Sequence, residues 1–244
     1  MENNFVVQDP LLPEDLAQRL FDTYCSGTTS LKWLHRDFGR FYTYMTPGDI
    51  LEVLEHFYND ETNPFYHDKV MMRNSHIYIQ RLVPGGFFPM HRERVHGVCS
   101  GYLTPEDDFE NLQEAGSYEW YNEPVWENID QEKDKPHSFA PGWNKGVLWK
   151  QSEEFPMNPF HRVAENKTDK HRYSVQMFFG KDAAPGGVSH TYKKFVRTNF
   201  TANELKTGGL TIPNLFDLAE PRLQWMEENK DIIEELESQG EFLV

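Results

Sequence analysis

Apolar residues recur at helical spacing in two segments near the start of the chain. A short strand is predicted at 5–8, and an amphipathic helix begins near Pro13-Glu14, where acidic residues suit the first turn. A second helix is predicted from about Pro47 to Asn59. Its apolar face carries Ile50, Leu51, Leu54 and Phe57. We expect both helices to cover another part of the fold rather than to carry chemistry.

From Ser75 onward the pattern alternates with a period of two, which indicates strands. The run HIYIQRLV is one such strand, and Pro-Gly-Gly at 84–86 forces a turn after it. Further strands are predicted at 145–151 and 172–180, separated by a turn-rich segment. Short strands joined by Gly and Pro turns predict a mostly β fold with flanking helices, built on an antiparallel jelly-roll core (a double-stranded, cupin-like β-helix).

The length of 244 residues permits one domain with extra helices or two very small domains, and we favour a single domain spanning 1–244. In this division, 1–74 supplies the first strand and supporting helices, and 75–182 forms the jelly-roll core. An acidic, aromatic insertion at 106–135 lacks clean periodicity. The extension 183–244 ends in a helix predicted at 221–239, where Pro221 suits a first helical position.

Acidic residues outnumber Lys and Arg by 39 to 24, which gives a formal charge of −15. A field of this sign repels phosphate backbones, so nucleic acid is not an expected partner. No apolar run approaches the roughly 18 residues that cross a bilayer, so no membrane span is expected. The opening MENNFVVQDP carries acid where a signal peptide carries base. We therefore expect a cytoplasmic protein whose Cys25 and Cys99 are reduced and buried.

The segment FFPMHRE contains a candidate metal site. Residues i and i+2 of an extended chain point to the same side, so His91 and Glu93 can converge on one ion. The pattern alone is weak, because a solvated pair at a strand end fits it equally well and it occurs a second time at His35-Arg36-Asp37. The best candidate for a third ligand is His161, with the nearby His171 as its competitor.

The strand that begins at Arg172 places polar groups on one face. Arg172, Ser174 and Gln176 share that face, and a barrel strand with polar groups turned inward usually has a ligand to bind. A guanidinium with a hydroxyl two residues later is well matched to a carboxylate. Two histidines and one carboxylate leave three positions open on an octahedral ion, as expected of non-haem Fe(II) oxygenases.

Four motifs follow one another along the chain: IYIQRLVPGGFFPMHRE, GYLTP, PFHRV and HRYSVQMFF. In this order they make the chain resemble the Fe(II)/2-oxoglutarate-dependent oxygenases, and most closely their prolyl-4-hydroxylase-like branch. The resemblance spans about residues 4–182, and its specificity lies in the ordered combination of motifs. Two departures from the family pattern are the acid, which is Glu93 rather than the commoner Asp, and the short segment between the metal motif and GYLTP.

The resemblance implies a role for each matching position. His91, Glu93 and His161 would be the catalytic iron ligands, and Arg172 would pair with the C5 carboxylate of 2-oxoglutarate. Ser174 and Tyr102 would assist Arg172. The implied cofactor is Fe(II), with 2-oxoglutarate and O2 as cosubstrates. The implied reaction hydroxylates an unactivated C–H bond and releases succinate and CO2.

The substrate is less constrained than the reaction. A small-molecule substrate, such as a free amino acid or a biosynthetic intermediate, fits a compact chain, and the alternatives are a prolyl or other protein residue and a cupin-like metal protein that does not use 2-oxoglutarate. Arg92, Arg94 and His96 either bind an anionic group of the substrate or only offset the acidic surface. The insertion at 106–135 is a candidate lid over the iron.

Overall fold

A computed structural model describes residues 5–26, 33–35, 38–73, 75–91, 95–122, 129–130, 134–152, 158–179, 200–201 and 242–243. Three predictions from the sequence lie outside these residues: the helix at 221–239, the acid Glu93, and its neighbours Arg92 and Arg94. Within the described part of the chain, no helix has the length and apolar character needed to span a membrane.

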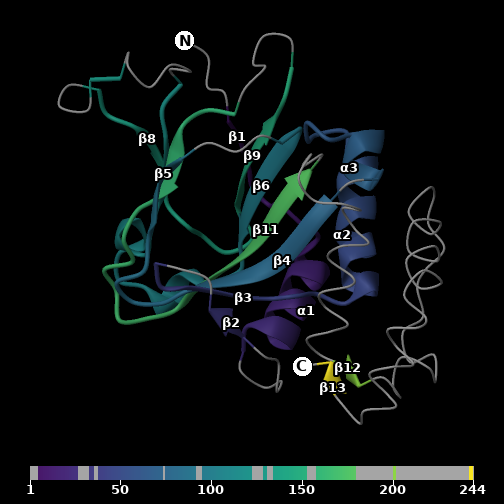
Figure 1. The fold of residues 1–244 in the computed structure, drawn as a ribbon, viewed down its shortest axis with the longest axis horizontal. Coiled ribbons are helices and arrows are strands. Elements are labelled where there is room, and N and C mark those ends of the chain that lie inside the picture. Colours follow the sequence, from purple (N-terminus) through teal and green to yellow (C-terminus); the bar gives the residue numbers. More distant parts are fainter. Residues whose placement is uncertain are drawn as a thin grey trace.

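Two antiparallel sheets form the core of the molecule (Figure 1). The larger sheet has seven strands in the order β1-β9-β6-β11-β4-β3-β2 and the smaller sheet has four in the order β5-β10-β7-β8. The strands of the larger sheet are β1 (Val6–Gln8), β2 (Leu34–His35), β3 (Arg40–Thr43), β4 (Ser75–Leu82), β6 (Gly97–Tyr102), β9 (Gly146–Lys150) and β11 (Arg172–Phe179). Those of the smaller sheet are β5 (Phe88–His91), β7 (Tyr118–Trp120), β8 (His137–Phe139) and β10 (His161–Val163). A separate pair joins β12 (Phe200–Thr201) to β13 (Phe242–Leu243).

Three helices, α1 (Glu14–Tyr24), α2 (Pro47–Asn59) and α3 (Lys69–Arg73), pack beside the larger sheet (Figure 1). Helix α2 begins where the sequence predicts it because the Thr46 hydroxyl accepts a hydrogen bond from the Asp49 amide at 3.1 Å and Pro47 occupies the first turn. Buried side chains of α1 and α2 join Val175 and Met177 of β11 in one core. Both helices therefore cover one face of the larger sheet.

Strand β11 separates two environments, as the alternation in its sequence predicts. It pairs with β4 on one side and β6 on the other, so Ser174 lies opposite both Gln80 and Tyr102. Val175 and Met177 face the helices, whereas Leu82 and Tyr102 belong to a second apolar cluster between the sheets. The predicted fold class, a mostly β jelly-roll core with flanking helices, is confirmed.

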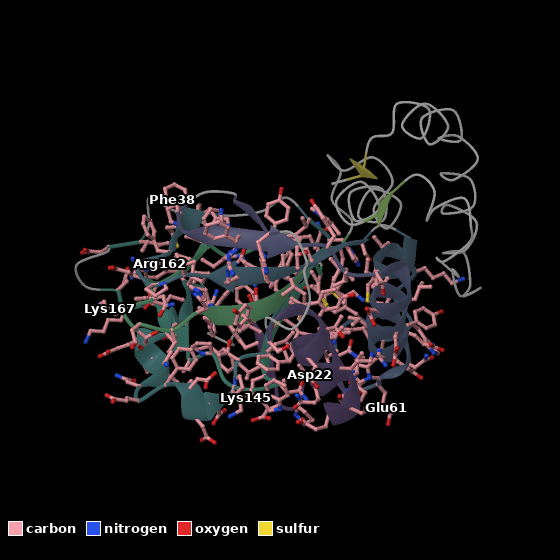
Figure 2. The ribbon with its side chains drawn as sticks, turned by 90° about the horizontal axis from the view of Figure 1, so that it is seen from below. Asp22, Phe38, Glu61, Lys145, Arg162 and Lys167 are labelled. Carbon is pink, nitrogen blue, oxygen red and sulfur yellow. The ribbon has the colours of Figure 1, made fainter. Side chains whose placement is uncertain are left out.

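The region predicted as an insertion, 106–135, contributes to the core fold. After the short 3₁₀ helices η1 (Glu106–Asp108) and η2 (Leu112–Glu114), β7 joins the smaller sheet and pairs with both β10 and β8. The sequence pattern missed β7 because three residues are too few to show a period and its neighbours are acidic. Asp22 and Lys167 are both exposed, and Lys167 extends from the edge of the molecule into solvent (Figure 2).

Candidate active site

The two histidines proposed as metal ligands are direct cross-strand neighbours. In the antiparallel pair β5–β10, His91 lies opposite His161, and their ring centroids are 4.2 Å apart. The register shifts between His161 and Val163, a local irregularity of the kind that re-aims side chains beside functional sites. His171, the alternative ligand, is exposed and lies just before β11. The fold therefore brings His161, rather than His171, to His91.

Both histidine rings are oriented by the same local contact. Nδ1 of His91 is 2.8 Å from the carbonyl oxygen of Pro89, and Nδ1 of His161 is 2.9 Å from that of Pro159. A carbonyl can only accept, so each Nδ1 carries the proton, and in the neutral ring the lone pair is on Nε2. Metal-ligating histidines are usually fixed in this way. The two rings are thus in the tautomer that binds a metal through Nε2.

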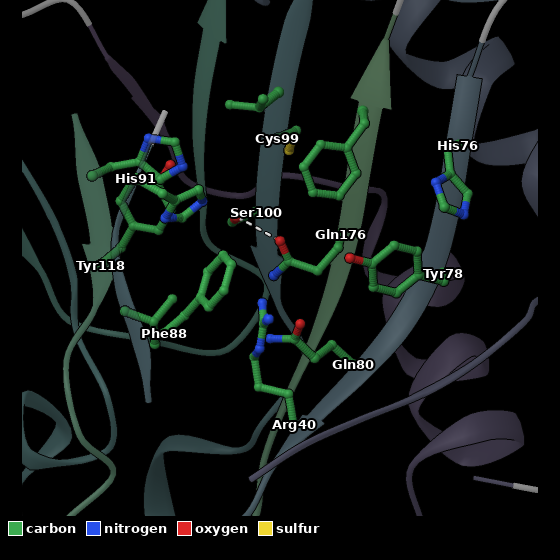
Figure 3. Close-up of a pocket in the computed structure, with 14 residues that line it drawn as sticks. Arg40, His76, Tyr78, Gln80, Phe88, His91, Cys99, Ser100, Tyr118 and Gln176 are labelled. Carbon is green, nitrogen blue, oxygen red and sulfur yellow. Dashed lines mark hydrogen bonds between the residues drawn. The ribbon is translucent and has the colours of Figure 1, made fainter. Parts of the chain in front are cut away.

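These histidines line a cavity of about 180 Å³ between the two sheets (Figure 3). Its opposite wall includes Ser100 and Gln176, which are linked by a hydrogen bond of 2.9 Å from the serine hydroxyl to the glutamine carbonyl oxygen. Gln176 in turn donates to the Ser174 hydroxyl at 3.0 Å. Polar side chains therefore continue from the cavity along the inner face of β11 toward Arg172.

Arg172 lies at the start of β11 and is fully buried. Its Nη1 donates to the carbonyl of Gly116 at 2.8 Å. Among the described residues, no hydrogen-bond partner reaches its Nε or Nη2. Burial lowers the pKa of Arg172, and the nearby charge of Arg40 adds to this, while Tyr102 acts in the opposite direction. A buried cation with two unpaired donors is costly unless a ligand completes its hydrogen bonding.

Tyr102 lies against the same guanidinium, whose central carbon is 5.0 Å from the centroid of the tyrosine ring. Burial raises the pKa of Tyr102 to about 12, and Arg172 partly offsets this. Within the described part of the chain, the Tyr102 hydroxyl also has no hydrogen-bond partner of ordinary geometry. The buried donors of Arg172 and Tyr102 form one cluster whose chemistry suits a carboxylate.

The structure does not bring His96 to the cavity. Its Nε2 is 2.7 Å from the carboxylate of Asp68, which also receives Lys150 at 2.6 Å, and we call these three residues the Asp68 triad. Burial raises the pKa of Asp68, but the hydrogen bonds from His96 and Lys150 outweigh it, so the net pKa is well below its ordinary value. His96 thus contacts the half-buried ion pair of Asp68 and Lys150, and its predicted role in substrate binding has no geometric support.

Several cavity residues escaped the sequence analysis, above all Arg40, Gln80 and Tyr118. Tyr118 stacks on His161 with ring centroids 5.2 Å apart and an interplanar angle of 13°. Only the pairing of distant strands brings these residues to the site, so a single sequence carries no local signal for them. The described residues, which do not include Glu93, contain no cluster of three or more His, Cys, Asp or Glu side chains that could hold a metal ion.

With the two-sheet fold and the paired histidines established, the chain has the fold of the prolyl-4-hydroxylase class of jelly-roll proteins. It is similar to the crystal structure of a Pseudomonas putida prolyl-4-hydroxylase, with a TM-score of 0.55 and 14% sequence identity over 74% of this chain and 94% of that chain. It is also similar to HygX from Streptomyces hygroscopicus, solved with nickel, 2-oxoglutarate and hygromycin B, with a TM-score of 0.48 and 12% identity over 74% and 84% of the two chains.

No family model and no curated protein sequence matches the chain. At these low identities the structural similarity establishes the fold, and on that level the predicted resemblance to the prolyl-4-hydroxylase-like branch is confirmed. The chemistry must be argued from the residues themselves.

Proposed function

We propose that the protein is an Fe(II)- and 2-oxoglutarate-dependent dioxygenase that hydroxylates an unactivated C–H bond of a small polar substrate. The observation that carries the proposal is the cross-strand pair of His91 and His161, each with its Nδ1 on a backbone carbonyl, together with the buried donors of Arg172 and Tyr102 on the larger sheet. One set of residues fits a metal, and the other fits a carboxylate.

The donor set fits Fe(II). Two imidazoles from paired strands would supply two ligands, and Glu93, two residues after His91 in the sequence, would supply the third. Two histidines and one carboxylate on one face leave three positions open for a chelating cosubstrate and O2. Bound there, Fe(II) would activate O2 at the expense of 2-oxoglutarate, which leaves as succinate and CO2 while the substrate gains a hydroxyl group.

The chain's own residues would bind and orient the cosubstrate. The Arg172 fork can accept a carboxylate through its Nε and Nη2, and the Tyr102 hydroxyl can donate to the same group. Ser174 lies directly opposite Tyr102 and two residues after Arg172 on β11, and it accepts a hydrogen bond from Gln176, so its own proton can be donated toward the carboxylate. The aromatic rings of Phe88 and Tyr118 pack on His91 and His161 and would shield that side of the site from water.

The experiment that tests the proposal is an anaerobic titration of the Fe(II)-loaded protein with 2-oxoglutarate, monitored by the weak visible charge-transfer band of direct chelation. We expect a band in the wild type and none in His91→Ala or His161→Ala. His171→Ala is the matched control, because His171 is exposed, precedes Arg172 and should leave the band unchanged. Iron binding without any band would favour a cupin-like metal protein, and the absence of iron binding would refute the metal site.

A small substrate is supported by the size of the cavity. Its volume of about 180 Å³ is below the roughly 300–1,000 Å³ of pockets for drug-sized ligands. The alternative, a prolyl or other protein residue, has in its favour the prolyl-4-hydroxylase found by structural comparison. Substrate-dependent succinate formation separates the two: free amino acids should stimulate it under our proposal, whereas stimulation by peptides alone would establish the alternative.

We also propose a cytoplasmic location and no nucleic-acid partner. Cys25 and Cys99 are both buried free thiols, as expected of a reducing compartment. The formal charge of −15 disfavours binding to phosphate backbones. Fractionation of cells that express the tagged full-length chain tests the location, and recovery in a secreted or membrane fraction would refute it.

A further inference from the structure

Three buried polar side chains on the inner face of the larger sheet form one hydrogen-bonded chain, which we call the polar chain. It runs from Ser100 of β6 through Gln176, its direct partner on β11, to Ser174 on the same strand. Ser174 is fully buried, and Ser100 and Gln176 are 6% and 8% exposed. The two ends of the polar chain lie in different places. Ser100 lines the cavity that contains the histidine pair, whereas Ser174 lies two residues after Arg172 and opposite Tyr102.

The hydrogen bonds of the polar chain all point the same way. The Ser100 hydroxyl donates to the Gln176 carbonyl oxygen, and the Gln176 amide nitrogen donates to the Ser174 oxygen. The Ser174 proton is therefore left for the carboxylate that the proposed function assigns to Arg172 and Tyr102. Hydrogen bonds that run in one direction polarise and strengthen one another. A carboxylate bound at the Ser174 end would thus fix the direction of the whole polar chain.

This direction determines what Ser100 can bind. A serine hydroxyl has one proton and two lone pairs, and the proton of Ser100 goes to Gln176. Only lone pairs remain for a ligand in the cavity, so Ser100 can accept a hydrogen bond but cannot donate one. At neutral pH 2-oxoglutarate offers carboxylate and keto oxygens, all of which are acceptors, so it cannot fill this position. The donor that Ser100 can accept must come from another molecule.

The surroundings of Ser100 favour an uncharged donor. Figure 3 shows its bond to Gln176 in the cavity wall, with the ring of His91 on one side and that of Tyr78 on the other. The described residues that line this cavity include no carboxylate. A buried ammonium group without a counter-ion is costly, whereas a hydroxyl or an amide group has no charge to neutralise. A neutral O–H or N–H group therefore suits this position best.

We propose that Ser100 accepts a hydrogen bond from an uncharged hydroxyl or amide group of the substrate, and that the polar chain links this contact to the carboxylate of 2-oxoglutarate. This inference rests on the proposed function, because it assigns Arg172 to the cosubstrate and the cavity beside the histidines to the substrate. It narrows the substrate from a small polar molecule to one that carries such a donor, for example a free amino acid with a hydroxyl or amide side chain. Gln176 is then a positioning residue, which acts by orienting the protons of Ser100 and Ser174.

The test uses full-length protein loaded with Fe(II) and 2-oxoglutarate under anaerobic conditions. Amino acids with such a donor are each titrated beside a probe of similar shape that lacks it: threonine with valine, serine with 2-aminobutyrate, asparagine with leucine, and glutamine with methionine. Binding is read from the perturbation of the visible charge-transfer band. We expect at least one donor to bind about ten-fold more tightly than its matched probe.

Variants of Ser100 assign this preference to its hydroxyl. In Ser100→Ala the 2-oxoglutarate band should persist, and the selected amino acid should bind no more tightly than its matched probe. Ser100→Thr, which keeps the hydroxyl, should retain most of the preference. Thr43→Val is the matched control, because it removes a buried hydroxyl from a residue paired with Ile79 of the helix-side core. This control should behave as the wild type in every titration.

The link through the polar chain gives a second measurement. In the wild type, the selected amino acid should raise the affinity for 2-oxoglutarate about five-fold, because the two ligands bind opposite ends of one hydrogen-bonded chain. In Gln176→Met, which replaces the amide with an apolar side chain of similar length, this factor should fall to about one while both ligands still bind.

Three results would overturn this inference and leave the proposed function standing: equal binding within every pair, no binding of any of these amino acids beside an intact 2-oxoglutarate band, or a preference that survives in Ser100→Ala. An unchanged coupling factor in Gln176→Met would overturn it as well, because the polar chain would then carry no link between the ligands. Absence of the band in the wild type would instead refute the proposed function, and the inference with it.

Discussion

Replacement of Arg172 by methionine should separate the stability of the fold from the binding of 2-oxoglutarate. Arg172 is fully buried, yet only its Nη1 has a partner among the described residues, the Gly116 carbonyl at 2.8 Å. Each buried donor left unpaired costs about 1–3 kcal/mol. Such a group persists in a fold when a ligand, rather than the rest of the protein, satisfies it.

We expect Arg172→Met to maintain or raise the stability of the protein and to weaken its binding of 2-oxoglutarate. In the protein without metal or cosubstrate, Arg172→Met removes the two unpaired donors, leaves the Gly116 carbonyl without its donor at a cost of about 1 kcal/mol, and keeps much of the apolar volume. We expect the variant to be at least as stable as the wild type, by up to about 3 kcal/mol. Loss of two charge-assisted hydrogen bonds, each worth about 1.5–3 kcal/mol, should weaken 2-oxoglutarate binding roughly 10²- to 10⁴-fold.

Urea denaturation of the metal-free protein measures the first effect, and anaerobic titration with 2-oxoglutarate measures the second. Asn144→Gly is the matched control. The buried Asn144 amide accepts from the Leu12 amide at 3.0 Å and donates to the Leu12 carbonyl at 2.8 Å, and its φ of 52° suits glycine. This control should lose about 2–3 kcal/mol of stability and bind 2-oxoglutarate normally. If Arg172→Met loses as much stability as Asn144→Gly, or binds 2-oxoglutarate normally, the reasoning is wrong.

Three further substitutions test other parts of the molecule. Tyr102→Phe should weaken 2-oxoglutarate about ten-fold in the same titration without loss of apo stability, because it removes an unpaired hydroxyl. Asp68→Asn should cost about 3–5 kcal/mol near pH 7 by breaking the Asp68 triad. The pKa of Asp68 is depressed below its ordinary value of 3.8, so the wild type should lose this extra stability as the pH falls below 3.8. The difference in unfolding free energy between the wild type and Asp68→Asn, measured in urea, should therefore begin to narrow below that pH. Gly97→Ala should lower the unfolding free energy by about 1–3 kcal/mol because its Cβ would overlap the Phe65 ring, whereas Gly48→Ala in α2 meets no such contact and should be neutral.

Local patterns were sufficient for the elements whose residues determine their own geometry. Helix α2 has the predicted bounds because Thr46 caps it and its apolar positions share one face. Strands β4 and β11 have nearly the predicted bounds, because eight residues show a period of two clearly. The same alternation correctly placed Arg172 and Ser174 on one face.

Residues that reach the site through distant pairing could not be predicted in this way. Strand β7 has three residues and becomes a strand because β10 and β8 lie on either side of it. Arg40 faces the cavity because β3 pairs with β4 in one register, and a shift of one residue would turn it to the opposite face. The contact of His91 with His161 depends in the same way on the β5–β10 register. Sequence reasoning selected the residue types, and the pairing of strands determined which of them meet.

The two faces of the larger sheet differ in their role: one stabilises the fold, and the other carries the candidate site. Toward the helices, β11 contributes fully buried apolar side chains such as Val175 and Met177. These side chains stabilise the fold by removing apolar surface from water, and they carry no polar group that needs a partner. Toward the smaller sheet, the same strand contributes Arg172, Ser174 and Gln176, which are nearly as buried but polar. Burial of polar groups on that face lowers stability unless each finds a partner. Because the helix-side core offsets this cost, the inner face can keep buried donors such as Nε and Nη2 of Arg172, and these donors are the strongest physical argument for a ligand site on this face.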